Sequence, residues 1–256
     1  MNATKIRLER FLDGDAARIV LCAPPGNVLD HQMMREVSEA LDALARDAKL
    51  KLVCFTGEGK HFSFGASVEE HVGERAAGML RGFHGMFEKL VALGVPTAAV
   101  VRGRCLGGGM ELAAFCNWVF AHPGAVFAQP EIQLGVFAPV ASLVLPQKIG
   151  QSRADDVNLT GRNIEAGEAK AMGLVDHLAD DPAVALEEWA RRELAPKSAA
   201  ALRFANRAAR WRWNQLVRDE LPALERFYLD ELMGSHDANE GLAAFLEKRK
   251  AVWEHR

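Results

Sequence analysis

The chain has 256 residues, of which 49% are apolar, and a formal net charge of −3. This apolar fraction suffices for a packed core and argues against disorder, while the lack of a basic excess argues against nucleic acid as a partner. No stretch approaches the roughly 18 apolar residues of a membrane span, so we expect no membrane association. None of the four cysteines forms a Cys-x-x-Cys pair, which predicts free buried thiols, no zinc site and a cytoplasmic location.

The first half of the chain alternates between short apolar runs and amphipathic helical patterns. Asp13-Gly14 separates the first two runs and indicates a hairpin, and Asp30 is a plausible N-cap for the first helix. Repeated strand and helix order predicts an α/β fold with a largely covered sheet. The expected strands are residues 5–11, 16–23, 50–56 and 97–101, and the expected helices follow Asp30, span 79–90 and begin near residue 110.

The pattern changes near Asp180, where we place a boundary between regions 1–180 and 181–256. From Pro182 to the end the sequence reads as almost entirely helical, with breaks expected at Pro196, Pro222 and Gly234. These helices are rich in aromatic residues, which need a surface to cover. Packing within the chain and a subunit interface both remain open on this pattern alone.

Residues 97–131 hold the densest chemical signal. An apolar strand is followed by a loop at 102–106, by three glycines at 107–109 and by a helical pattern. A helix that starts after glycines leaves backbone N–H groups unpaired and favours negative charge beside them. Glu111 lies in the first helical turn and Glu131 follows a second apolar segment. The alternative is a tight turn with two solvated glutamates, because a lone glycine motif is a weak signal.

Several segments occur in one order along most of the chain: GEGKHFSFGAS, VVRGRCLGGGMELAAFCNWVFA, FAQPEIQLGV and EGLAAFLEKRK. Together they resemble the enoyl-CoA hydratase/isomerase (crotonase) family. The resemblance implies a spiral of ββα units with a C-terminal helical trimerisation region, although no internal sequence repeat is visible. It also implies an acyl-CoA thioester substrate, no separate cofactor or metal, and a homotrimer or homohexamer.

The resemblance implies roles for particular residues. Glu111 and Glu131 match the two acid/base glutamates, without indicating which is the acid and which the base. The backbone N–H groups of Ala66 and Gly108 match the oxyanion donors that stabilise a thioester enolate. Phe64 and Ala66 are expected to contact CoA. Charged candidates for its phosphates are Lys248, Arg249 and Lys250, with Arg102 and Arg104 as further candidates of the same quality, although such a cluster is often only a solvated face.

The chain departs from the family beside the second glutamate. A glycine-rich turn is replaced by residues 137–142, FAPVAS, in which Phe137 and Val140 add bulk and Pro139 removes an N–H. Ser67 stands where an Asp is common. These four residues are therefore expected to shape the substrate pocket and to disfavour straight-chain crotonyl substrates. The segment GVFAPVAS is similar to the subgroup that hydrates cyclic dienoyl-CoA thioesters in anaerobic degradation of aromatic compounds.

Four further functions remain open. A general straight-chain enoyl-CoA hydratase, or an enoyl-CoA isomerase or thioester hydrolase, could use the same scaffold. A catalytically silent CoA- or RNA-binding relative is the non-enzyme alternative. Two glutamates favour hydration, because an isomerase can operate with one, and they argue against lost catalysis. The acidic charge balance argues against RNA.

Overall fold

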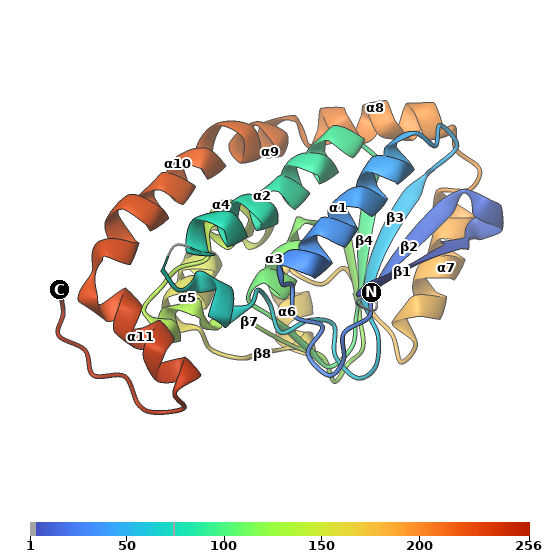
Figure 1. Ribbon diagram of the computed structural model, residues 1–256. Coiled ribbons are helices and arrows are strands. Elements are labelled where there is room, and N and C mark those ends of the chain that lie inside the picture. Colours follow the sequence, from blue (N-terminus) through green and yellow to red (C-terminus); the bar gives the residue numbers. More distant parts are fainter. Residues whose placement is uncertain (1–3, 74) are drawn as a thin grey trace.

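A mixed six-stranded sheet forms the frame of the computed structural model, which describes residues 4–73 and 75–256 (Figure 1). The strand order is β1-β2-β3-β4-β6-β9, with β1 and β2 antiparallel and every other neighbouring pair parallel. The strands are β1 (Ile6–Phe11), β2 (Ala16–Leu21), β3 (Leu52–Gly57), β4 (Thr97–Val101), β6 (Trp118–Ala121) and β9 (His177–Leu178). The expected hairpin and the four expected strands are thus confirmed.

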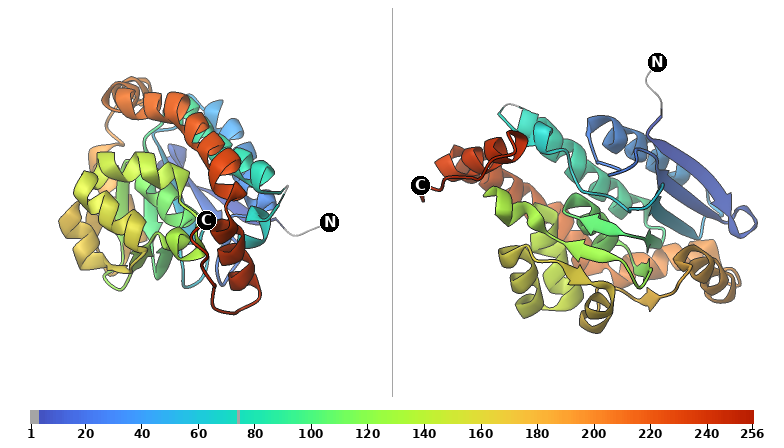
Figure 2. Two further views of the ribbon diagram at one scale, coloured as in Figure 1. Left: turned by 90° about the vertical axis from the view of Figure 1, so that its left-hand side faces the viewer. Right: turned by 90° about the horizontal axis from the view of Figure 1, so that it is seen from below.

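Both faces of this sheet are covered, as the alternation of side chains along its central strands requires. Val53 and Phe55 of β3 face the larger core with helices α1 (His31–Ala45) and α2 (Arg75–Leu93). Leu52 and Cys54 face the smaller core with α7 (Pro182–Glu193). In the right-hand view of Figure 2, α1 and α7 lie on opposite sides of the sheet.

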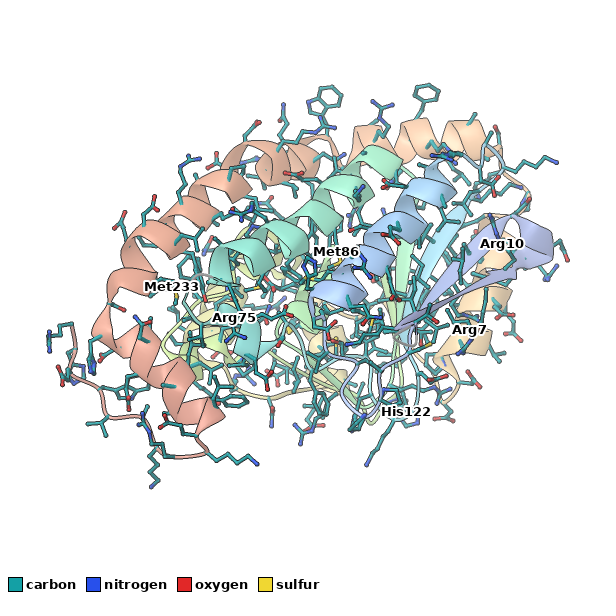
Figure 3. The ribbon with its side chains drawn as sticks, viewed as in Figure 1. Arg7, Arg10, Arg75, Met86, His122 and Met233 are labelled. Atoms are coloured by element: carbon teal, nitrogen blue, oxygen red, sulfur yellow. The ribbon has the colours of Figure 1, made fainter. Side chains whose placement is uncertain are left out.

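Local sequence explains where these helices begin and which face they bury. The Asp30 carboxylate accepts a hydrogen bond from Met33 N at 3.0 Å, so this residue is the N-cap of α1 as predicted. Met86, labelled in Figure 3, marks the fully buried face of α2. His122, at the lower edge of the same view, marks the end of β6.

A second, smaller sheet converts the βα order into a spiral. It consists of β5 (Arg104–Leu106), β7 (Val126–Ala128) and β8 (Ile164–Glu165). Successive units then read β4–β5–α3 and β6–β7–α4, with α3 at Gly108–Phe115 and α4 at Pro139–Ile149. This is the ββα spiral that the resemblance implied. The expected loop at 102–106 was wrong in part, because its last three residues form β5 by pairing with β7.

The elements that follow α7 form an arc that returns over the spiral (Figures 1 and 2). The segment η4 contacts α2, α10 contacts α4, and α11 contacts both η2 and η3. The arc consists of α8 (Ala199–Ala209), α9 (Trp211–Gln215), η4 (Leu216–Glu220), α10 (Leu221–Arg226), η5 (Phe227–Glu231), η6 (Leu232–Gly234) and α11 (His236–Leu246). The other elements of the spiral are η2 (Val68–His71), η3 (Pro130–Leu134), α5 (Gln151–Thr160) and α6 (Ala166–Met172).

Two expectations for this arc need correction. Pro222 does not break it, because the proline lies in the first turn of α10, directly after the wide turn of η4, where its missing N–H is tolerated. Residues 250–256 are not helical, although the break at Gly234 is confirmed. The helices beyond residue 181 contribute to both cores, through Leu186 to one and Leu221 to the other.

The aromatic residues of the arc divide between interior and surface. Trp189 packs on Trp118 with ring centroids 4.5 Å apart, and Trp213 packs on Phe115 at 5.9 Å. Phe204 remains 71% exposed. Within residues 4–73 and 75–256, no helix combines the length and the apolar character needed to cross a membrane. Cys54, Cys105 and Cys116 are buried free thiols, and Cys22 is half-buried.

Candidate active site

The register of the small sheet brings distant residues into one row. Ser63 pairs with Cys105, and Cys105 pairs with Phe127, all in parallel. Because parallel neighbours end at the same edge, the segments that follow these three residues emerge side by side. Ala66 follows the first, and the glycines that open α3 follow the second. Pro130 and Glu131 follow the third.

Two backbone N–H groups converge at this edge. A Cβ on Gly108 would lie 3.1 Å from Ala66 N, and a Cβ on Gly65 would lie 2.9 Å from Gly108 N. Gly65 adopts a φ of +96°, which glycine accommodates without strain. Among the described residues, neither N–H donates to a backbone or side-chain acceptor, whereas Gly107 N is bonded to Ala128 O. The pair can therefore stabilise negative charge that develops on one oxygen.

Glu111 lies in the first turn of α3 and is only 3% exposed. Its Oε1 accepts a hydrogen bond from Ala141 N at 2.8 Å, in the first turn of α4. Burial, reinforced by the nearby charge of Glu131, raises the Glu111 pKa to about 8, and the N–H groups of Ala141 and Val140 only partly oppose this. The carboxyl can therefore hold a proton near neutral pH.

Glu131 reaches the same space from η3. A Cβ on Gly107 would lie 2.5 Å from Glu131 Oε1, so the carboxylate lies against a backbone position that carries no side chain. Burial raises the Glu131 pKa to about 7. The Gln129 amide, with its nitrogen toward Gly107 O and Glu131 Oε2 at 3.2 Å each, donates to both and orients the carboxylate. Sequence reasoning missed Gln129, although a lone amide inside an apolar run was the available signal.

These groups open into one pocket. Ala66, Gly108, Glu111 and Glu131 all line it. Phe64, Phe137 and Pro139, three other residues predicted from the sequence, line it as well. The remaining wall consists mainly of apolar side chains that the sequence did not indicate: Val68, Met79, Leu80, Phe83, Leu134, Val136, Tyr228 and Leu242, with the ring of His71.

Four predicted site residues do not line the pocket. Ser67 caps η2 and its carbonyl accepts from His71 Nδ1 at 2.7 Å. Val140 is buried and turns its N–H, rather than its side chain, toward Glu111. Arg249 is paired with Glu240 and Glu247, and Lys248 is exposed beside it. Of the further candidates for the CoA phosphates, Arg102 forms an ion pair with Asp181.

The segment at 137–142 is not a modified turn, as the sequence suggested, but the start of a helix. Pro139 occupies the first turn of α4, where a missing N–H costs nothing. The N–H groups that follow it point at Glu111. In residues 4–73 and 75–256 no cluster of three His, Cys, Asp or Glu side chains could hold a metal ion.

The ββα spiral with this row of site residues defines the crotonase class of folds. The family model described as enoyl-CoA hydratase/isomerase matches residues 14–256, and the chain belongs to this family. It is 46% identical over 252 residues to cyclohexa-1,5-dienecarbonyl-CoA hydratase of Thauera aromatica, covering 98% of this chain and 97% of that one. It is 36% identical to a probable enoyl-CoA hydratase of Mycobacterium bovis, covering 90% of each.

A solved enoyl-CoA hydratase/isomerase from Xanthobacter autotrophicus Py2 superposes with a TM-score of 0.83 at 28% identity. The match covers 97% of this chain and 98% of that one. Sequence and structure comparisons therefore agree on the family and on the fold over almost the whole chain.

Proposed function

We propose that the protein is a hydro-lyase that adds water to a conjugated acyl-CoA thioester, with cyclohexa-1,5-diene-1-carbonyl-CoA as its substrate. The observation that carries the reaction is the meeting of two carboxyls with raised pKa values and two unpaired N–H groups in one apolar pocket. The 46% identity to a hydratase named for this ring supports the substrate.

The chemistry follows from these groups. One carboxylate removes a proton from water as its oxygen bonds to a carbon at one end of the diene, and electrons move to the thioester oxygen. The N–H groups of Ala66 and Gly108 stabilise that oxyanion. The other carboxyl delivers its proton to the carbon at the far end, which completes a 1,4-addition and leaves a 6-hydroxycyclohex-1-ene thioester. Two carboxyls this close to each other do not both ionise readily, so one keeps the proton that the reaction needs.

The shape of the pocket favours a ring. Phe137 packs on Phe227 and Tyr228, with ring centroids 5.5 and 5.3 Å apart, so the wall beside Glu131 is aromatic and braced from outside. Pro139 fixes the start of α4 next to it. A rigid apolar slot holds a flat ring with less loss of conformational entropy than a flexible acyl chain.

Steady-state kinetics on two thioesters test the substrate. We expect kcat/KM for the cyclic diene to exceed that for crotonyl-CoA by at least ~10-fold, which asks for about 1.4 kcal/mol of differential transition-state binding. Equal or better activity on crotonyl-CoA would replace the ring by straight-chain enoyl substrates. A shifted double bond without hydration would indicate an isomerase.

The proposal extends to the rest of the protein. CoA enters past Phe64, its phosphates lie near Lys248 and Arg249, and no metal or redox cofactor takes part. Region 181–256 serves assembly into a homotrimer or homohexamer, which the exposed rings of Phe204 and Trp211 support. Sedimentation at micromolar concentration tests the assembly, and a stable 28.0 kDa monomer would refute it. Free thiols support a cytoplasmic location.

A further inference from the structure

Tyr228 is the single tyrosine of the chain, and it lies in the pocket with its hydroxyl unpaired. The side chain is 1% exposed, and within the described residues Tyr228 Oη has no hydrogen-bond partner. Its ring meets Phe137 edge to face at 5.3 Å. Buried hydroxyls are nearly always bonded, so an exception in a substrate pocket points to a partner that arrives with the substrate.

Packing alone does not account for this residue. Phenylalanine would present the same ring to Phe137 without burying an unbonded hydroxyl, and would therefore be the more stable choice. Tyr228 lies in η5, a π-helical turn, and such turns are frequent at functional sites. At this position the chain therefore carries a hydroxyl that lowers the stability of the folded state.

The surroundings of the hydroxyl define what it can do. Burial, together with the negative charges of Glu131 and Glu111, raises the pKa of Tyr228 well above its usual value. The phenol therefore stays protonated throughout the working range of the two carboxyls. It is too weak an acid to supply the proton for carbon, and it is suited to donate a hydrogen bond close to both carboxyls.

We propose that Tyr228 Oη donates a hydrogen bond to the oxygen atom that enters as water and remains in the product as its hydroxyl. This inference rests on the proposed hydratase function. The water proton goes to one carboxylate, the second carboxyl protonates carbon, and Tyr228 keeps its own proton throughout. The hydrogen bond from Tyr228 fixes the attacking oxygen on the side of the substrate ring that faces the C-terminal helices.

The test is a cycle of two enzymes and two ligands. Wild type and Tyr228→Phe are compared for inhibition by 6-hydroxycyclohex-1-ene-1-carbonyl-CoA and by cyclohex-1-ene-1-carbonyl-CoA, which lacks the hydroxyl. We expect Tyr228→Phe to bind the hydroxy ligand ~10-fold more weakly, about 1.4 kcal/mol, and the other ligand within 2-fold of wild type. Its kcat should fall at least ~10-fold while its thermal midpoint rises.

A purely structural role gives a different pattern. The change in affinity from wild type to Tyr228→Phe would then be the same for both ligands, and kcat would stay within 2-fold of wild type. This result would overturn the inference. Because there is one tyrosine, 3-fluorotyrosine gives a single ¹⁹F resonance. This resonance should shift more when the hydroxy ligand binds than when cyclohex-1-ene-1-carbonyl-CoA binds. Equal shifts with the two ligands would also contradict the proposed hydrogen bond.

Different results would refute the role of Tyr228 and the proposed hydratase function. If wild type hydrates crotonyl-CoA instead of the ring, the same cycle is run with 3-hydroxybutanoyl-CoA and butanoyl-CoA. A wild-type enzyme that hydrates neither thioester refutes the function itself. A wild-type hydratase with an unchanged Tyr228→Phe variant refutes only the role of Tyr228.

Discussion

Replacing Gly107 by alanine should displace the Glu131 carboxylate without removing it, and so test how far catalysis depends on its position. The new Cβ would lie 2.5 Å from Glu131 Oε1, and the carboxylate would have to retreat by about 0.9 Å to reach an ordinary separation of 3.4 Å. A misplacement of about 1 Å in a catalytic group can cost ~10²-fold in rate, equivalent to about 2.7 kcal/mol. We therefore expect kcat to fall ~10²-fold although no side chain of the pocket is removed.

Backbone strain needs its own control, because Gly107 has a φ of +50°. Gly14 has a φ of +94° in the β1–β2 hairpin, and a Cβ there would meet nothing within 4 Å. Gly14→Ala should lose a similar ~1 kcal/mol or more in urea unfolding and keep its kcat. A folded Gly107→Ala enzyme with kcat within 3-fold of wild type would refute the reasoning.

The remaining predictions concern the two carboxyls. Glu111→Gln and Glu131→Gln should each lower kcat by roughly 10²-fold with little change in CoA-ester binding. Stopped-flow hydration assays with a competition binding measurement check this, and near-normal turnover in either variant would remove that residue from the mechanism. Stability should also depend on pH: burial raises the Glu111 pKa from 4.5 to about 8, so the native state binds this proton more tightly than the unfolded state does. The contribution of Glu111 to the free energy of unfolding should therefore be fully present below pH 4.5 and be lost as the pH rises toward 8. Urea titrations across that range should show a shallower fall for Glu111→Gln, and parallel curves would contradict the assignment.

Much of the frame follows from local sequence. The apolar runs of β3 and β4 are long enough to be recognised as strands in the sequence. Asp30 caps α1 through a local hydrogen bond that its position predicts. The two- and three-residue strands of the small sheet show no periodicity, so the row that aligns Ser63 with Cys105 is invisible in the sequence. The roles of Glu111 and Glu131 came from motif resemblance rather than from spacing.

Other features were hidden because a signal was ambiguous or absent. Pro139 was expected in a segment that replaces a glycine-rich turn, but it begins α4, because proline is compatible with the first helical turn. Tyr228 meets Glu131 only through tertiary packing, and no local pattern marks a distant aromatic residue as part of a pocket. Lys248 and Arg249 form a basic cluster in the sequence that suggested a phosphate site. In the structure, Arg249 forms an ion pair with Glu240 of the same chain.

The C-terminal arc also sets when a newly made chain can work. Ala66, Gly108 and Glu131 leave the ribosome well before Tyr228 and Leu242, which complete the pocket wall. At a synthesis rate of ~5–20 residues per second, on the order of ten seconds pass between the synthesis of Glu131 and that of the pocket wall that encloses it. During that interval the two acids face water. Messages truncated after α7 should therefore yield a chain that carries both glutamates and hydrates nothing.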